Sequence, residues 1–498
     1  MTDFTPTPEQ LACITAARDT EDNLLISALA GAAKTSTLVM IANALPDTNM
    51  LCLAFNKRIQ LEMQQRLPPN CTSLTLNSLG HRIWADSTGR RLILNKDKCI
   101  GHLRSLIDGL SKSEKEEAYD SFTEILRAVE LGKTVGYIPS HHYLDAQALM
   151  RDEEFYNWLD EEPTDLQWDL IRKVSLYSLK QAWAGEIDFN DQILMPTVFR
   201  CVFPRYPLVL IDEAQDLSAL NHAMLAKLAK GRLIAVGDEC QSIYGFRGAH
   251  EDSMQLLRER FNMRTLTLSV SFRCPQAVVR EAQWRAPHMR WPEWAKPGEV
   301  RHLTEWSADD IPNDSAIICR NNAPLFSMAI KLLKDGRAAE VVGNDIGRYL
   351  IRVMKKLGDA SMTREAALAA LADWKERKLR KSRNSDSVHD QADCIKLFLK
   401  QGNTLGQAIA YAEHIFAIAG PVKLMTGHKS KGLEFPHVFF LDEFLLRKDQ
   451  QDLNLRYVIQ TRAKETLTYV TSEAYVSSRD ADDVSEGGGS TDEEDVED

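Results

Sequence analysis

Short apolar runs alternate with segments of helical spacing over the first 80 residues of the chain. The runs Asn23–Leu29 and Met50–Phe55 are almost continuously apolar, which is typical of strands that are buried on both faces of a sheet. Each run is followed by a segment with helical spacing, Lys34–Ala44 and Lys57–Arg66. This alternation predicts parallel strands joined by crossover helices.

Strand patterns return in two later groups, and a helical stretch precedes them. Residues 81–185 are rich in Leu, Glu, Lys, Tyr and Trp, which predicts a helical insertion. The later expected strands are Tyr206–Ile211, Arg232–Val236, Thr265–Val270, Glu299–Leu303, Ser315–Cys319, Val422–Met425 and His437–Leu441. The later expected helices are Thr363–Arg383, Leu405–Ala417 and Leu453–Arg462. The pattern indicates an α/β protein with two sheet-forming units.

The negative charge of the chain is concentrated at its C-terminus. The formal net charge is −11, but residues 480–498 hold ten acidic residues and no Lys or Arg. The remainder carries 60 basic and 61 acidic side chains, so the overall acidity does not exclude a nucleic-acid partner for the body. We expect residues 479–498 to be a disordered acidic tail that aids solubility, imitates a nucleic-acid backbone or recruits a basic protein partner.

Composition also bears on the compartment. The chain has no run of about 18 apolar residues, and its N-terminus lacks a basic region followed by an apolar stretch. The nine cysteines are scattered without a C-x-x-C pair, which favours reduced thiols over a zinc site or a disulfide framework. We therefore expect no membrane partner and a cytoplasmic protein, associated with the nucleoid or, if it is encoded by a phage, in the host cytoplasm.

A turn of small residues follows the first expected strand. It reads S-A-L-A-G-A-A-K-T-S and leads into a helix, so its backbone N–H groups and the helix N-terminus can bind phosphate. The lysine can reach the outer phosphates of ATP, and the threonine hydroxyl can ligate Mg²⁺. An ordinary small-residue turn is the alternative. The candidate nucleotide-binding residues of this loop are Ala30, Gly31, Ala32, Ala33, Lys34, Thr35 and Ser36.

A pair of carboxylates ends the strand within Val209–Asp216, V-L-I-D-E-A-Q-D. The carboxyl ends of strands are where α/β sheets bind ligands. Asp212 can hold Mg²⁺ there, and Glu213 can accept a proton from the attacking water or orient it. The alternative is a strand that ends in an ordinary polar turn.

The segment Gly237–Ala249, G-D-E-C-Q-S-I-Y-G-F-R-G-A, also follows an expected strand. Gln241 stands where a side-chain amide can touch a γ-phosphate. Tyr244, Phe246 and Arg247 follow within a few residues, and aromatic side chains beside Arg suit base stacking and phosphate contact on single-stranded nucleic acid. For Phe246 taken alone, core packing is the alternative.

Together, D-E-A-Q-D and G-D-x-x-Q-S-I-Y-x-F-R-G-A resemble the motifs of UvrD/Rep-like superfamily 1 helicases, and the resemblance is collinear over nearly the whole body. The short second accessory region is similar to that of compact phage-type or F-box-helicase-like members. The resemblance implies two RecA-like motor domains with helical insertions. The implied parts are domain 1A (1–80 and 186–265), insertion 1B (81–185), domain 2A (266–340 and 416–478), a reduced domain 2B (341–415) and the tail (479–498).

The resemblance also implies further nucleotide contacts. Gln10, in F-T-P-T-P-E-Q, matches the family's adenine-reading glutamine, and Phe272, in S-F-R-C, would stack on adenine. Arg273 and Arg462 would contact the γ-phosphate, and Glu434 would contact the ribose. Because both arginines lie far downstream of the phosphate loop, they would act when the two motor domains close over ATP, and hydrolysis would release them.

Two further segments resemble the DNA-contacting motifs of the first motor domain, A-F-N-K and T-L-N-S-L-G. The second departs from the usual T-F-H-S at Leu76 and Asn77. A later segment, M-T-G-H-K-S-K-G-L-E-F, resembles a motif of the second motor domain that faces DNA. The DNA-contacting residues implied by all these motifs are Phe55, Asn56, Ser78, Tyr244, Phe246, Arg247, Thr426 and His428.

The resemblance thus implies a monomeric, ATP- and Mg²⁺-dependent DNA helicase. It would move 3′ to 5′ on single-stranded DNA and unwind single-strand/duplex junctions in replication, recombination or repair. One alternative is a translocase that removes proteins from DNA or loads partners with little unwinding. Another is an ATP-gated regulatory protein impaired by Ala33, which replaces the usual Gly and suits that position if its φ is negative or the loop relaxes slightly. The basic run Lys375–Arg383 either contacts DNA phosphates or is a solvated helix face.

Overall fold

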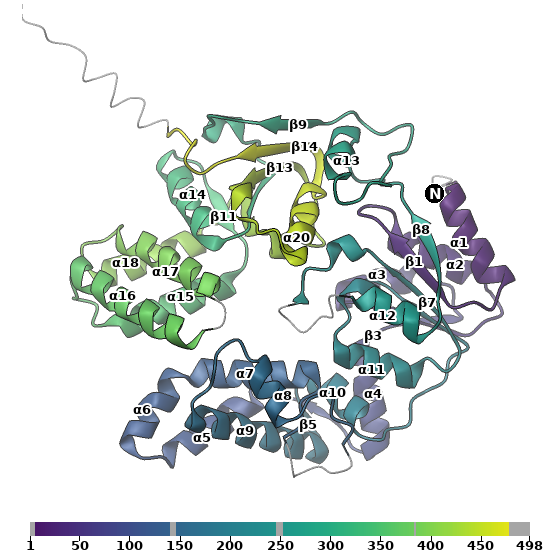
Figure 1. Ribbon diagram of the computed structural model, residues 1–498, viewed down its shortest axis with the longest axis horizontal. Coiled ribbons are helices and arrows are strands. Elements are labelled where there is room, and N and C mark those ends of the chain that lie inside the picture. Colours follow the sequence, from purple (N-terminus) through teal and green to yellow (C-terminus); the bar gives the residue numbers. More distant parts are fainter. Residues whose placement is uncertain (1–4, 140–145, 246–251, 383–384, 478–498) are drawn as a thin grey trace, which may run out of the picture. The chain divides into compact units, whose positions relative to one another are not determined.

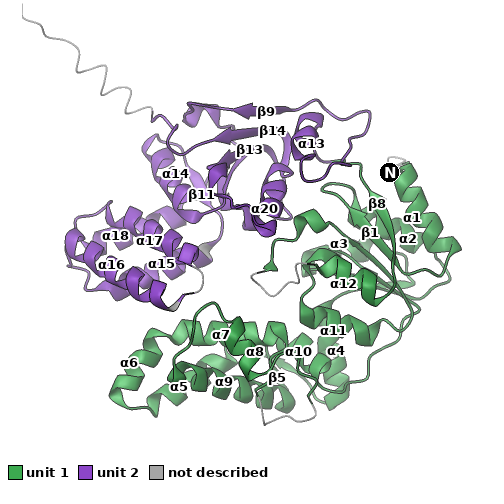
Figure 2. Cartoon of the chain, viewed as in Figure 1, with its two compact units in different colours: residues 1–272 green, residues 273–498 purple. Residues whose placement is uncertain are grey.

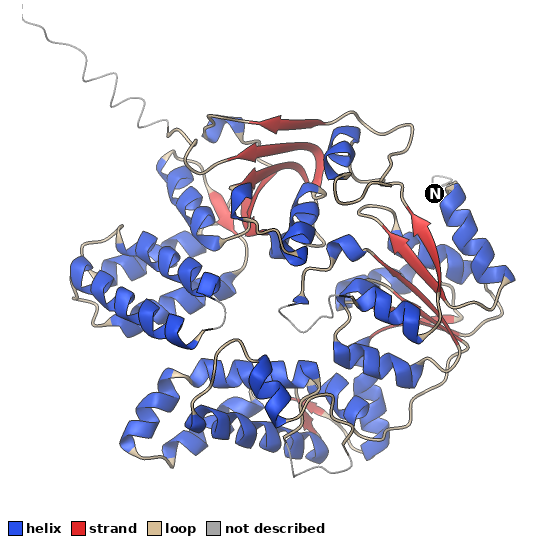
Figure 3. Cartoon of the chain, in the orientation of Figure 1, coloured by secondary structure: helices blue, strands red, loops and turns tan. Residues whose placement is uncertain are grey.

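The computed structural model describes residues 5–139, 146–245, 252–382 and 385–477. The chain divides into two compact units, Met1–Phe272 and Arg273–Asp498 (Figures 1 and 2). Each unit contains a six-stranded parallel sheet with helices packed around it (Figure 3). The predicted fold class, α/β with two parallel-sheet units, is confirmed.

The sheet of the first unit has the strand order β3-β2-β6-β7-β1-β8, and every pair is parallel. Its strands are β1 (Leu24–Ala28), β2 (Met50–Ala54), β3 (Cys71–Thr75), β6 (Leu208–Ile211), β7 (Arg232–Gly237) and β8 (Arg264–Leu268). The strands β6, β7 and β1 are neighbours, and each is followed by one of the three polar motifs. Because parallel strands end at the same edge, this order brings the three motifs together.

Helices cover both faces of this sheet. They are α1 (Pro8–Asp19), α2 (Lys34–Asn43), α3 (Lys57–Arg66), α4 (Leu76–Thr88), α10 (Asp191–Val198), α11 (Ala219–Leu228) and α12 (Ser253–Arg260). Successive strand residues point to opposite faces, so Leu24 and Ile26 pack with α1, α2 and α3, whereas Leu25 packs with α4, α11 and α12. This double coverage explains why the central strands read as continuous apolar runs.

The described part of residues 81–185 is mostly helical, as predicted. Its helices are α5 (Lys98–Asp108), α6 (Lys112–Asp120), α7 (Phe122–Val135), α8 (Asp152–Trp158) and α9 (Asp165–Ala184). The short strands β4 (Ile93–Leu94) and β5 (Glu186–Ile187) pair in a two-stranded parallel sheet. The helices enclose a core of their own, which includes Leu103, Val129 and Phe155. The insertion therefore has a core of its own, and α9 also packs against α4 and α10 in a second core.

The sheet of the second unit has the order β11-β12-β10-β13-β14-β9, again with every pair parallel. Its strands are β9 (Glu299–His302), β10 (Ser315–Cys319), β11 (Ala339–Val341), β12 (Val422–Thr426), β13 (Phe435–Leu441) and β14 (Ala463–Val470). Its helices are α13 (Gln276–Ala282), α14 (Asn322–Lys334), α15 (Asn344–Leu357), α16 (Arg364–Lys381), α17 (Ser385–Leu399), α18 (Leu405–Ala417), α19 (Gly427–Ser430) and α20 (Gln450–Gln460).

The four helices α15 to α18 do not form a core of their own. Met354 and Phe398 from these helices belong to one hydrophobic core with Ile317 and Leu424 of the sheet. The region expected at 341–415 as a reduced accessory domain is thus a small helical group that continues the core of the second sheet.

The sequence analysis did not predict two edge strands, β3 and β11. An edge strand is paired on one side only, and β3 carries Thr72, Ser73 and Thr75 in place of a continuous apolar run.

The domain boundary expected between residues 265 and 266 falls inside β8, whose residues all pair with β1, and the first unit ends at Phe272. Among the described residues, no helix is both long and apolar enough to span a bilayer. The acidic tail lies outside the described residues.

Candidate functional site

The turn between β1 and α2 has the backbone of a phosphate-binding loop. Ala32 donates its N–H to the Leu29 carbonyl (3.0 Å), which closes the turn. Gly31 (φ 74°) and Ala33 (φ 56°) both adopt left-handed conformations. α2 begins at Lys34, immediately after the turn, so the unsatisfied N–H groups of its first turn face the loop. The turn therefore offers a ready anion site.

The sequence analysis allowed an alanine here if its φ is negative or the loop relaxes slightly, and the positive φ of Ala33 shows that the first condition is not met. A Cβ in the left-handed region approaches the following carbonyl and costs roughly 1–2 kcal/mol. The strain is held in place because the Ala33 carbonyl accepts hydrogen bonds from the backbone N–H (2.9 Å) and hydroxyl (3.1 Å) of Thr37. Ala33 thus adopts the left-handed backbone conformation that glycine usually supplies.

Ala33→Gly is expected to stabilise the protein. Relief of the strain outweighs the roughly 0.4–1 kcal/mol that glycine adds to the entropy of the unfolded chain. The thermal midpoint, measured by calorimetry, rises by about 1–4 °C. Ala32→Gly is the matched control and lowers the midpoint, because the φ of Ala32 is not positive. A lower midpoint for Ala33→Gly would contradict the assignment of strain.

The predicted magnesium and base residues lie together beside this turn. The Thr35 hydroxyl donates to Asp212 Oδ2 (2.6 Å), and Lys34 Nζ lies 3.8 Å from Glu213 Oε2. Glu213 has a left-handed backbone (φ 53°), and its N–H donates to Asp212 Oδ1 (2.9 Å). A hydroxyl and a carboxylate are hard oxygen donors of the kind that Mg²⁺ prefers, so the donor set fits this ion.

Asp212 is buried, and burial together with the nearby charge of Glu213 raises its pKa to about 6. A carboxyl with a raised pKa binds a proton more tightly in the folded than in the unfolded chain, where its pKa is about 3.9. Without a metal, the wild-type protein therefore loses stability as pH rises from about 4 to about 6, by up to about 3 kcal/mol.

Asp212→Asn removes this pH-dependent penalty. In the presence of EDTA, we expect the variant and the wild type to have similar thermal midpoints at pH 4.5. At pH 8, the variant unfolds at a higher temperature, because its side chain cannot ionise. Thermal denaturation of both proteins at the two pH values measures the difference. A difference in midpoint that does not change with pH would rule out a raised pKa for Asp212.

A chain of hydrogen bonds links the second and third motifs. Gln215 Nε2 donates to Glu213 Oε2 (2.6 Å), and Gln215 Oε1 accepts from the Asp238 N–H (3.0 Å). Asp238 Oδ2 in turn accepts from Gln241 Nε2 (2.6 Å). Gln215 and Asp238 are absent from the sequence-predicted site residues. They stand inside D-E-A-Q-D and G-D-E-C-Q, so their place in those motifs is the signal that could have found them.

The two expected adenine contacts lie in different surroundings. Gln10 is buried in α1, where its amide donates to the Thr37 hydroxyl (3.1 Å) and accepts from the Thr7 N–H (3.0 Å). In this arrangement Gln10 ties α1 to α2. Phe272 is half-buried, and its N–H donates to the Gly31 carbonyl (2.9 Å), which attaches it to the phosphate loop.

In the second unit, two residues with separate predicted roles form an ion pair. Arg273 Nε donates to Glu434 Oε2 (2.7 Å), and Lys464 Nζ donates to Glu434 Oε1 (3.2 Å). Partial burial would raise the pKa of Glu434, but Arg273 and Lys464 outweigh it and lower the pKa overall. This carboxylate therefore stays charged and holds Arg273 in one place.

Arg462 is 1% exposed and follows Thr461, the residue that caps the C-terminus of α20. Its guanidinium donates to the carbonyls of Val458 (2.8 Å) and Leu433 (3.1 Å) and to the Thr461 hydroxyl (3.2 Å). Arg462 thus donates to backbone carbonyls and a hydroxyl of its own unit, whereas Arg273 pairs with a carboxylate.

The candidate DNA contacts of the first unit follow β2 and β3. Phe55 is 48% exposed, as a base-stacking residue would be. Asn56 caps α3 by accepting from the Ile59 N–H (3.0 Å), and the N–H of Ser78, in the first turn of α4, donates to the Thr75 hydroxyl (3.1 Å). The Asn56 side chain therefore caps α3, whereas the cap of α4 is Thr75, whose hydroxyl also donates to the Ser78 hydroxyl (3.0 Å).

The remaining candidate DNA contacts are divided between the two units. Tyr244 is half-buried after the third motif, whereas Phe246 and Arg247 lie outside the described residues. In the second unit, Thr426 ends β12 and is buried, and His428 is half-buried in α19.

Phe189 is an exposed aromatic residue that the sequence interpretation missed. It lies in the turn between β5 and α10 and is 57% exposed. Its carbonyl accepts a hydrogen bond from the Asn77 amide (2.7 Å), so it lies beside the motif T-L-N-S-L-G. Asn77 is one of the two residues at which this motif departs from the usual pattern. That departure was the feature of the sequence that could have drawn attention to Phe189.

Comparisons with known proteins agree with these motifs. The family model described as the UvrD/REP helicase N-terminal domain matches residues 7–262, and the UvrD-like helicase C-terminal domain matches residues 421–470. The chain is 22% identical to F-box DNA helicase protein 1 of Schizosaccharomyces pombe, covering 93% of this chain and 57% of that protein. It is 24% identical to ATP-dependent DNA helicase PcrA of Leuconostoc citreum (66% and 49%) and 24% identical to DNA helicase II of Escherichia coli K12 (52% and 38%). The chain spans about half the length of the curated relatives it matches.

Proposed function

The chain belongs to the UvrD/REP helicase family, and on that premise we propose that it is an ATP-dependent DNA helicase moving 3′ to 5′ on single-stranded DNA. The observation that carries this proposal is the connected cluster at the carboxyl ends of β1, β6 and β7. The cluster contains a turn that can bind phosphate and two oxygen donors that can bind a metal. It also contains a candidate base and a glutamine, and hydrogen bonds connect these side chains. A protein that only binds DNA does not need such a group.

In this proposal, Lys34 and the N–H groups of the turn bind the phosphates of ATP. Thr35 and Asp212 hold Mg²⁺, which supplies charge neutralisation of the phosphates when it is bound. Glu213 takes a proton from the attacking water, and Lys34 Nζ, 3.8 Å from Glu213 Oε2, helps to orient this carboxylate. Arg273 and Arg462 stabilise the negative charge that develops in the transition state.

The hydrogen-bond chain supports a link between hydrolysis and DNA. Glu213 is joined to Gln241 through Gln215 and Asp238. Gln241 lies three residues before Tyr244, a candidate DNA contact. A change in the charge or position of Glu213 during hydrolysis therefore acts on the segment that leads to the DNA. We propose that Phe55 and Phe189 contribute stacking to the same grip, about 1–3 kcal/mol for each base.

The direct test is ATP hydrolysis by the full chain, with and without single-stranded DNA. It is followed by strand displacement on duplexes with 3′ or 5′ overhangs. We expect DNA to stimulate hydrolysis and displacement to require the 3′ overhang. ATP hydrolysis that does not respond to DNA would contradict the proposed function. Displacement from the 5′ overhang alone would reverse the polarity, and translocation without strand displacement would favour the translocase alternative.

A further inference from the structure

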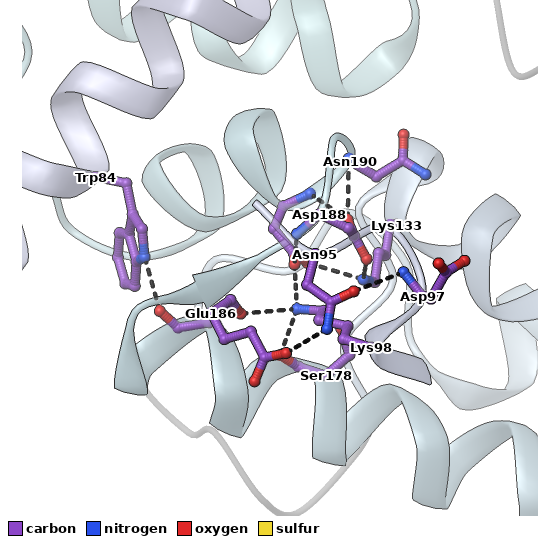
Figure 4. A network of polar contacts seen from close by, with 11 residues as sticks. Trp84, Asn95, Asp97, Lys98, Lys133, Ser178, Glu186, Asp188 and Asn190 are labelled. Carbon is purple, nitrogen blue, oxygen red and sulfur yellow. Dashed lines mark hydrogen bonds and ion pairs between the residues drawn. The ribbon is translucent and has the colours of Figure 1, made fainter. Parts of the chain in front are cut away.

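A buried ion cluster joins the helical insertion to the turn that carries Phe189 (Figure 4). Lys98 begins α5 and Lys133 lies in the last turn of α7, whereas Asp188 and Asp191 flank Phe189 in sequence. Lys98 pairs with Asp191, and Lys133 pairs with Asp188 and, at 2.9 Å, with Asp191. None of the four side chains is more than 16% exposed. The cluster thus connects two helices of the insertion to one short turn.

The two carboxylates that meet the lysines also close the turn. Asp188 Oδ1 accepts the backbone N–H groups of Asn190 and Asp191, both at 3.0 Å. Asp191 Oδ2 accepts the N–H of Asp188 (2.8 Å). The same groups therefore set the shape of the turn and tie it to the insertion.

The opposite side of the turn is held by α4. Asn77 donates to the Phe189 carbonyl (2.7 Å). At Gly80, an added Cβ would lie 1.9 Å from the Gln192 carbonyl oxygen, so α4 and α10 meet backbone to backbone. The phenyl ring of Phe189 stays exposed while its backbone is fixed from both sides. A fixed backbone restricts where the ring can lie before any ligand arrives, which lowers the entropic cost of binding.

Charge is favoured at Lys133 and Asp188, whereas burial raises the pKa of the Asp191 carboxyl despite the two lysines. Burial by itself would lower the pKa of Lys133, but Asp191 and Asp188 outweigh burial and raise it. Replacing one member leaves an opposite charge buried without its partner, which is strongly destabilising, whereas replacing a pair together is often tolerated. The role of the cluster is therefore best tested by removing charges in pairs.

We propose that Lys98 and Lys133 are positioning residues, which act through Asp188 and Asp191 to hold the 188–190 turn so that the Phe189 ring stacks on a base of single-stranded DNA. The inference rests on the proposed function, because an ordered aromatic turn contributes to binding only if the chain binds DNA. It assigns the helical insertion a part in the DNA grip of the first unit through buried charges, without direct contact between these lysines and DNA.

The test is a double-mutant cycle on the affinity of the full chain for a fluorescent oligothymidine, measured by anisotropy at one fixed salt concentration. One arm is Phe189→Ala. The other is the paired variant Lys133→Met with Asp188→Asn, in which the amide oxygen at position 188 can still accept the N–H bonds of the turn. Lys173→Met on α9 is the control, because it removes a lysine of the same insertion that is 54% exposed and pairs only locally with Asp169.

We expect Phe189→Ala to weaken binding by about 5- to 150-fold, the range of one lost stacking contact. The paired variant weakens binding when Phe189 is present. It has no further effect in the Phe189→Ala protein, because the Lys133–Asp188 pair acts through the Phe189 ring. The control changes affinity less than about 2-fold, since exposed ion pairs contribute little.

Equal weakening by the paired variant in both backgrounds would overturn the inference, since it would indicate a general structural role. Wild-type affinity of the paired variant would overturn it as well. If Phe189→Ala leaves DNA affinity unchanged in a protein whose hydrolysis responds to DNA, the inference fails while the proposed function stands. If the wild type neither binds DNA nor hydrolyses ATP, both fail together.

Discussion

Glu213→Gln is expected to reduce the turnover number for ATP about 10²- to 10⁴-fold while ATP binding is retained. The amide keeps the size of the side chain and can still accept from Gln215 Nε2, which donates to Glu213 at 2.6 Å. It cannot accept a proton from water at neutral pH. Steady-state hydrolysis with saturating single-stranded DNA measures turnover, and titration with a fluorescent ATP analogue measures binding.

The matched control is Glu443→Gln in the second unit. Glu443 also follows an aspartate directly after a strand, β13, and the preceding Asp442 has a left-handed backbone (φ 51°). Glu443 pairs with Arg456 (2.5 Å), whereas Glu213 lies 3.8 Å from Lys34 of the phosphate-type turn. We expect this change to lower turnover by less than about 10-fold. Equal losses for the two variants would show that Glu213 has no special role as a base.

Arg273→Ala is expected to lower turnover by about 10³- to 10⁵-fold, the range for arginines that stabilise phosphoryl-transfer transition states. The fold should tolerate the change, because the Arg273 side chain is 22% exposed and its ion pair with Glu434 is on the surface of the unit. Arg462→Ala is a poorer test, since the buried guanidinium of Arg462 holds three groups of its own unit together.

Lys464→Ala controls for the loss of positive charge beside Glu434. Lys464 donates to the other oxygen of this carboxylate (3.2 Å), so its removal disturbs the same group without removing Arg273. We expect turnover within about 3-fold of the wild type, because an exposed ion pair is worth little. Turnover by Arg273→Ala close to that of Lys464→Ala would exclude a role for Arg273 in the transition state.

The local sequence pattern predicts much of the candidate nucleotide site, because the residues of this site lie at the ends of buried strands. An apolar run followed by Asp212 and Glu213 reveals both the strand and the edge at which its polar residues emerge. The same reasoning finds Lys34 after β1 and Gln241 after β7. Gln215 and Asp238 were overlooked because their bonds join two motifs that are separate in sequence.

The candidate DNA contacts were less predictable than the candidate nucleotide site. Asn56 and Ser78 are polar residues of motifs that resemble DNA contacts, yet both engage the starts of helices. Phe189 belongs to none of the motifs recognised in the sequence, and its exposure depends on packing between α4 and α10. The roles expected for Phe246, Arg247 and the tail fall outside the described residues.

The sequence by itself determined the fold class, most of the central strands and the motifs of the candidate nucleotide site. These follow from local periodicity and from residue chemistry, which act over a few positions. Only the tertiary structure decided the positive φ of Ala33, the pairing of Arg273 with Glu434 and the joining of Lys133 to Asp188. The two ion pairs join residues 161 and 55 positions apart, and the backbone of Ala33 is set by the turn around it. Such contacts depend on how the chain is packed, and no local pattern encodes them.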